Sequence, residues 1–202
     1  MQHYKCCFCE REYEIKHATV EHFRPKTEAS DDTRNRGHKR PGYWWLAYEL
    51  GNLYFCCRNC NTPKATFFPL DPGASPLTPR TLPTQVPEQA QLLDPGGTDD
   101  PEAHIQWRWM GRRRGYVPVG STIRGRQTVR ASELDVRDTL CRLRAKFYDR
   151  RVRPILEDFQ NAKARGDHAE MAQVRTRARK LAQPQEQFAA MTRWILRRNG
   201  VL

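Results

Sequence analysis

Cys6-Cys7-Phe8-Cys9 and Cys56-Cys57-Arg58-Asn59-Cys60 are the two stretches of this sequence that decide its fold. Each contains a Cys-x-x-Cys pair, which places two thiolates on one tight turn. Two such pairs brought together form the tetrahedral four-cysteine site that is usual for structural zinc. We therefore predict that Cys6, Cys9, Cys57 and Cys60 bind Zn²⁺. The ion would add folding free energy to a segment too short to build a large core.

Cys7 and Cys56 lie beside these pairs and interrupt neither spacing. We interpret both as small packing residues, with the alternative that one of them replaces a neighbour as zinc ligand. The rival for all six cysteines is a redox or disulfide role, which a reducing compartment disfavours.

The composition indicates a folded, cytoplasmic protein. A chain of 202 residues is long enough for one or two domains, and 38% hydrophobic residues argue against a disordered chain. No apolar run approaches the roughly 20 residues that cross a membrane. The polar start, Met1 to Cys6, lacks the apolar core of a signal peptide.

The formal net charge of +12 favours a polyanionic partner, of which nucleic acid is the commonest in a cell. Charge alone is weak evidence, because a solvated basic surface gives the same excess. The basic residues of the C-terminal part carry the same two interpretations, phosphate binding or a solvated helix surface. They are Arg142, Arg144, Arg150, Arg151, Arg153, Arg175, Arg177, Arg179 and Lys180.

Composition divides the chain into three segments. Residues 1–70 hold both cysteine pairs and many aromatic residues. Residues 71–131 form a connector that begins with Pro, Gly, Thr and Gln and contains a short β-hairpin, in which Ile105, Trp107 and Trp109 alternate before Tyr116. Residues 132–202 form a basic helical bundle. The fold class predicted from these segments is α+β.

The helical pattern begins at about Ser132. Hydrophobic residues recur at spacings of three and four, which places them on one helix face. They are Val136, Leu140, Leu143 and Phe147. We expect a kink or restart at Pro154, a stop at Gly166, and a new helix capped by Asp167 with Glu170. A third helix follows Pro184 and ends near Gly200.

Between the cysteine pairs lies Thr19-Val20-Glu21-His22-Phe23-Arg24-Pro25-Lys26, followed by Asn52-Leu53 and by Cys60-Asn61-x-x-Lys64. This order of motifs resembles an HNH endonuclease, whose ββα-metal core is held by zinc. A wider set of sequence segments resembles a subfamily that includes the nuclease subunit of Septu-type antiphage systems and related retron effectors. These segments are Glu21 to Lys26, Gly42 to Glu49, Phe68-Pro69, Leu92 to Pro95 and Asp99 to Glu102. The resemblance extends to about residue 145 and is strongest up to Leu70.

The resemblance implies metal-dependent hydrolysis of phosphodiester bonds in DNA, and it assigns the site residues. His22 is the expected general base, since a histidine with a pKa of about 6.5 is largely neutral in the cell. Glu21 and Asn61 are the expected ligands of a catalytic Mg²⁺ or Mn²⁺, which prefers oxygen. Asn52 is expected to brace the loop and orient His22.

Glu21 is the less secure of the two expected ion ligands. Neighbouring residues of a regular strand point to opposite faces, so Glu21 and His22 face one ion only if the strand ends there or if one of them acts through its backbone. The family also has Asp more often than Glu at this position.

For the residues around the Glu21-His22 motif, the sequence allows two interpretations each. Arg24, Lys26 and Lys64 are candidate nucleic-acid contacts, with solvated charge as the alternative for the first two and helix capping for Lys64. The segment Tyr43 to Tyr48 is interpreted as core packing rather than as a base-stacking platform.

Two hypotheses for the function follow. In the first, the protein is an antiphage endonuclease that cuts DNA, with RNA as a further substrate class. In the second, it is a non-catalytic, zinc-stabilised module that binds nucleic acid or acts as an adaptor. The resemblance also implies an ATPase partner subunit. The C-terminal helices are then its docking surface or a DNA clamp.

Overall fold

The computed structural model describes the whole chain except residues 1, 33–36, 80 and 82–87. Part of the predicted connector therefore lies outside the described residues. The chain divides into two compact units. Unit 1 comprises residues 1–105 and 120–134, and unit 2 comprises residues 106–119 and 135–202. The structure is α+β, with small sheets and a four-cysteine group in the N-terminal part and helices towards the C-terminus.

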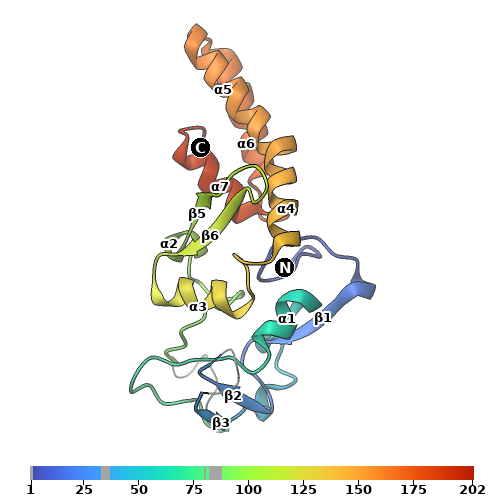
Figure 1. The fold of residues 1–202 in the computed structure, drawn as a ribbon, viewed down its shortest axis with the longest axis vertical. Helices are drawn as coiled ribbons and strands as arrows, with labels where there is room; N and C mark the ends of the chain where they lie inside the picture. Colours follow the sequence, from blue (N-terminus) through green and yellow to red (C-terminus); the bar gives the residue numbers. More distant parts are fainter. Residues whose placement is uncertain (1, 33–36, 80, 82–87) are drawn as a thin grey trace. The chain divides into compact units, whose positions relative to one another are not determined.

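Unit 1 is built on an antiparallel strand pair followed directly by a helix (Figure 1). Strand β1 (Ala18–His22) pairs with β4 (Leu53–Cys57), and helix α1 (Arg58–Lys64) continues from β4. In the register of this pair, Ala18 lies opposite Cys57 and His22 lies opposite Leu53. The strand pair therefore carries a zinc-ligand candidate at one end and the candidate base at the other.

Short elements complete unit 1. A second antiparallel pair is formed by β2 (Glu28–Ser30) and β3 (Lys39–Pro41). The remaining elements are the 3₁₀ turns η1 (Ile15–His17), η2 (Trp44–Leu46) and η3 (Leu50–Asn52) and the helices α2 (Pro101–His104) and α3 (Ile123–Ala131). Helix α3 lies within the predicted connector and was not expected; Thr122 caps its start by accepting a hydrogen bond from the Gly125 amide.

The core of unit 1 is a cluster of aromatic and aliphatic side chains between the strand pair and the following loops. Its members are Phe23, Ala29, Tyr43, Leu46, Phe67, Phe68, Leu77, Ala90, Leu92 and Ala131. Phe23 and Phe68 meet edge to face with ring centroids 5.2 Å apart, a favoured aromatic geometry. Phe23 follows His22 directly, so this core anchors the chain where β1 ends.

Unit 2 consists of a hairpin and a set of helices. Strands β5 (Ile105–Trp109) and β6 (Tyr116–Gly120) form a two-stranded sheet, which confirms the predicted hairpin. The helices are α4 (Asp138–Phe147), α5 (Arg153–Arg165), α6 (His168–Leu181) and α7 (Ala189–Arg198), with a π-helical turn η4 (Tyr148–Val152) between α4 and α5. Helices α5 and α6 pack against each other.

The predicted helix boundaries of unit 2 are partly confirmed. Gly166 ends α5 in the left-handed conformation with φ of 68°, and the Asp167 side chain accepts a hydrogen bond from the Glu170 amide at the start of α6. At Pro154 the chain passes through the π turn into α5. The predicted start at about Ser132 is wrong, because Ser132 ends α3 and the next helix begins at Asp138.

Two side chains, one in α4 and one in the segment just before it, differ from the predicted pattern. Val136 precedes the helix and is exposed, so it does not belong to the predicted apolar face. Arg144, predicted on the basic outer face, is 1% exposed and its guanidinium lies over the Trp107 ring at 5.0 Å. A cation over an indole face is an attractive contact, which makes this arginine part of the core. None of the described helices is long and apolar enough to span a membrane.

Candidate functional site

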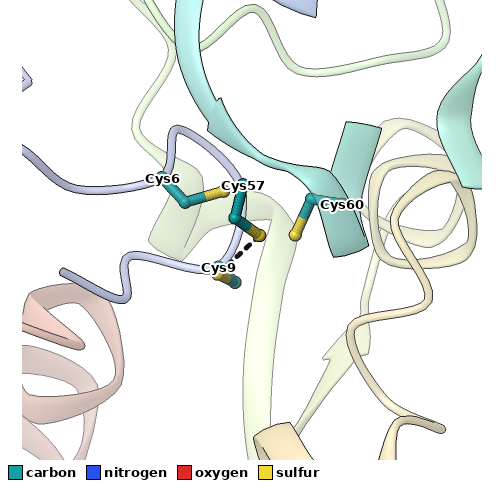
Figure 2. Close-up of side chains that lie close together, drawn as sticks. All are labelled: Cys6, Cys9, Cys57 and Cys60. Carbon is teal, nitrogen blue, oxygen red and sulfur yellow. Dashed lines mark hydrogen bonds between the residues drawn. The ribbon is translucent and has the colours of Figure 1, made fainter. Parts of the chain in front are cut away.

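The two cysteine pairs meet in the structure. The sulfur atoms of Cys6, Cys9, Cys57 and Cys60 all lie within 4.8 Å of one another, and the four residues are buried. Figure 2 shows Cys6 and Cys9 on the N-terminal loop, facing Cys57 and Cys60 from the end of β4 and the first turn of α1. The Sγ atoms of Cys9 and Cys57 are 3.9 Å apart, close to the roughly 3.8 Å edge of a tetrahedron with Zn–S bonds of 2.3 Å. The group is therefore compatible with structural zinc.

Backbone hydrogen bonds shape the loop that carries the first pair. The Cys6 amide donates to the Arg11 carbonyl at 2.9 Å, and the Glu10 amide donates to the Cys6 carbonyl at 3.0 Å. Glu10 has a φ of 56°, the left-handed conformation that closes the turn. Hydrogen bonding with neighbouring cysteine side chains, first Cys56 and then Cys57, holds the pKa of Cys6 well below the usual value of 9.0. A thiolate is the form that binds metal.

His22, the predicted base, lies at the end of β1 and is half-buried. Its Nε2 is 3.0 Å from the carbonyl oxygen of Ala47. A carbonyl oxygen only accepts hydrogen bonds, so a neutral His22 must carry its proton on Nε2. The lone pair is then on Nδ1, which is the nitrogen able to take a proton. Burial lowers the pKa of His22 from 6.5. The hydrogen bond to Ala47 acts in the opposite direction and raises this pKa, whereas the charges of Lys26 and Lys64 lower it further.

Asn52 ties together the two segments that hold His22. Its Oδ1 accepts from the Arg24 amide at 2.7 Å, and its Nδ2 donates to the carbonyls of Arg24 at 3.0 Å and Leu46 at 3.2 Å. Arg24 follows His22 by two residues, and Leu46 precedes Ala47, whose carbonyl bonds the ring. The side chain thus links the loop after β1 to the segment whose carbonyl bonds the imidazole, and its role in positioning His22 stays a prediction.

Glu21 and Asn61, the predicted ligands of a catalytic ion, face different partners. Glu21 is 2% exposed, and its Oε1 forms an ion pair of 2.5 Å with the Lys64 Nζ. Asn61 donates its amide nitrogen to the Thr19 hydroxyl at 2.9 Å and to the Val20 carbonyl at 3.0 Å, which leaves its oxygen as the atom it can offer an ion. Asn61 thus fits an oxygen-ligated ion, whereas Glu21 in this conformation does not, because a buried ammonium already neutralises its carboxylate.

Lys64 and Arg24, predicted as nucleic-acid contacts, are both buried. Lys64 is fully buried and also donates to the His22 carbonyl at 3.1 Å. Arg24 is 7% exposed and pairs with Glu88 at 2.8 Å. Neither cation is available to a phosphate in this structure, because each stabilises the chain around His22. Lys26 is exposed and available.

Glu88 is a site-supporting residue that the sequence pattern does not reveal. It lies in the predicted connector, is fully buried, and accepts hydrogen bonds from Arg24 and, at 2.5 Å, from the Tyr43 hydroxyl. Its partners are 64 and 45 residues away in the chain, so no local spacing indicates the contact.

The aromatic segment 43–48 is divided between core and surface. Tyr43 and Leu46 are buried, as predicted, whereas Trp44 is 66% and Tyr48 is 94% exposed. The interpretation as core packing is therefore wrong for these two residues. They flank Ala47, the residue that holds the His22 ring.

Comparison with curated proteins relates part of this chain to a protein of an antiphage system. Over 109 residues, this chain is 32% identical to the Septu protein PtuB of Bacillus mycoides (strain KBAB4). The alignment covers 53% of this chain and 36% of that relative, so the chain spans about a third of the relative's length. The chain is thus a distant homologue of PtuB over about half of its own length. No protein-family model and no solved structure matches it.

The Glu21–Lys64 pair generates the first testable prediction. Replacing Lys64 with Met leaves a buried carboxylate without its cation, which costs about 3–5 kcal/mol when a buried pair is broken. We expect Lys64→Met to lower the free energy of unfolding by that amount in urea denaturation followed by circular dichroism. The double variant Glu21→Gln/Lys64→Met should lose less than Lys64→Met alone, because neither buried charge remains.

Lys26→Met is the matched control, since Lys26 is an exposed lysine of the same segment and surface substitutions change stability by about 0.5 kcal/mol or less. Additive losses in the double variant would contradict the pairing.

Proposed function

We propose that this protein is an HNH-type endonuclease that hydrolyses phosphodiester bonds in DNA, with His22 as the general base. The observation that carries the proposal is the contact between His22 Nε2 and the Ala47 carbonyl, because it presents Nδ1 as an unprotonated nitrogen. A histidine held in one tautomer by a backbone carbonyl is prepared to accept a proton from water.

The arrangement around His22 supports this assignment. Strand β1, strand β4 and helix α1 follow in the order of a ββα-metal module, with the four-cysteine group at the end of the strand pair away from His22. In the proposed reaction, Nδ1 of His22 takes the proton of a water molecule as its oxygen attacks the scissile phosphorus. Asn52 acts as a positioning residue, because it fixes the segments on both sides of the ring.

A divalent ion, Mg²⁺ or Mn²⁺, is the proposed cofactor of the reaction in addition to structural Zn²⁺. When bound, such an ion stabilises charge at the scissile phosphate and at the leaving oxygen. Asn61 is the residue that offers it an oxygen in this structure, while Glu21 is engaged with Lys64. The ion requirement is therefore a prediction that the cutting assay below tests with chelator.

Substrate contact is proposed for exposed side chains on the two chain segments that meet at the His22–Ala47 contact. Lys26 supplies an accessible cation for a phosphate, and Trp44 and Tyr48 supply exposed aromatic faces on either side of Ala47. Bases of a single strand stack on such faces, at about 1–3 kcal/mol per base. The exposed aromatic faces therefore favour a DNA substrate with unpaired bases.

The biological role is proposed to be antiphage defence. It is supported by the relation to PtuB, a Septu protein, and by the motifs shared with Septu-type nuclease subunits. We further propose that an ATPase subunit is the partner, and that helices α4 to α7 of unit 2 provide its docking surface.

His22 is tested by cutting assays on plasmid and single-stranded circular DNA with Mg²⁺, Mn²⁺ or EDTA. We expect wild-type protein to nick DNA with either ion and not with EDTA. His22→Ala should lose at least the roughly 100-fold that general base catalysis contributes. His38→Ala, an exposed histidine of the same unit, is the matched control and should cut like wild type.

Equal cutting by His22→Ala would refute His22 as the base. If wild-type protein is inactive on DNA, on RNA and in the presence of a co-purified ATPase, the non-catalytic binding module replaces the nuclease as the proposed function.

The pH dependence follows from the direction of the His22 pKa. A base acts in its neutral form, so the cutting rate should rise with pH and level off above the pKa of His22. Burial lowers that pKa from 6.5, so the midpoint of the rise should lie below pH 6.5. Initial rates measured from about pH 5 to 8 locate it. A midpoint above 6.5 would contradict the environment described for His22.

A further inference from the structure

A second group of thiols lies beside the four-cysteine group. The sulfur atoms of Cys6, Cys7 and Cys56 all lie within 4.8 Å of one another, and the Sγ atoms of Cys6 and Cys56 are 3.7 Å apart. Cys6 belongs to both groups, so the six cysteines of unit 1 form one continuous cluster of sulfur atoms.

The path of the chain explains how this second group forms. Cys56 lies in β4 and Cys57 is the last residue of that strand, so both come close to the N-terminal loop where β4 meets α1. The Cys7 amide donates to the Phe55 carbonyl at 3.0 Å, which ties the N-terminal loop to β4 next to Cys56. The same two chain segments that bring the four ligands together therefore also bring Cys7 and Cys56 together.

We propose that Cys6, Cys7 and Cys56 bind a second thiophilic divalent ion, zinc in the cell, and that the Cys6 thiolate is shared between the two ions. The Cys6–Cys56 separation of 3.7 Å matches the roughly 3.8 Å edge of a zinc–thiolate tetrahedron. Three thiolates leave one coordination position, which water completes, because Cys7 is the one residue of the three that is partly exposed.

The cluster can take a second ion without an increase in buried charge. Four thiolates around one zinc ion leave a net charge of −2, and two further cysteines add none while they stay protonated as thiols. When a second divalent cation binds, those two cysteines release their protons and the net charge of the cluster stays at −2. Sharing Cys6 then places one thiolate between two cations, where its charge is stabilised by both.

The test is the number of zinc ions bound per chain, measured by native mass spectrometry of the full-length protein and by elemental analysis. Wild-type protein purified with Zn²⁺ should carry two ions. A single ion in the presence of excess Zn²⁺ would overturn the proposal, and this measurement needs no variant that must fold.

Two variants locate the second ion. Cys7→Ser and Cys56→Ser should each retain one ion and the wild-type circular dichroism spectrum, because the group Cys6, Cys9, Cys57 and Cys60 stays complete. Cys141→Ser is the matched control, since Cys141 is buried in unit 2 and belongs to neither group, and it should retain two ions. Two ions in both Cys7→Ser and Cys56→Ser would place the second zinc elsewhere and refute the assignment.

Discussion

The convergence of Cys6, Cys9, Cys57 and Cys60 is the constraint on which unit 1 depends. It joins a loop at the start of the chain to the junction of β4 and α1, segments that are otherwise connected through about fifty residues of short elements. The site exists only when these segments meet, so the free energy of metal binding adds to the stability of the folded unit, which a small core cannot supply alone. The strand pair extends from this junction, so the position of His22 follows from it.

At the other end of the strand pair, buried polar contacts hold the chain together with the aromatic core around Phe23. Asn52 bonds the backbone on both sides of the histidine ring, Lys64 pairs with Glu21, and Arg24 pairs with Glu88. The partners in each of these contacts lie inside the protein, and buried polar contacts of this kind specify one geometry of the chain. This explains how a segment with short strands can hold one imidazole tautomer towards solvent.

Local patterns in the sequence predict the elements but not the long-range partners. Cys-x-x-Cys spacing, the alternation around Trp107, Gly166 and Asp167 each lead to the observed structure, because turns, strands and caps depend on near neighbours. In the sequence, three basic residues have the pattern of surface cations, but the structure buries them: Lys64, Arg24 and Arg144. The sequence does not reveal their burial, because their partners Glu21, Glu88 and Trp107 are distant in the chain. Helix α3 escapes the pattern because glycine and arginine interrupt its apolar face. Motif resemblance is the source of the roles assigned to His22, Asn52 and Asn61. The structure adds the hydrogen bonds that each of these side chains makes.

The dependence of His22 on the metal site is tested most directly by ¹⁵N NMR of its ring, recorded in zinc-loaded protein and after removal of zinc with a chelator. The His22→Ala variant assigns the signals. We expect a neutral ring protonated on Nε2 while zinc is bound. After chelation that tautomer should be lost to the mixture typical of an unfolded chain, because the strand pair loses its metal tie. A ring protonated on Nδ1 in the loaded protein, or a spectrum that chelation leaves unchanged, would contradict this expectation.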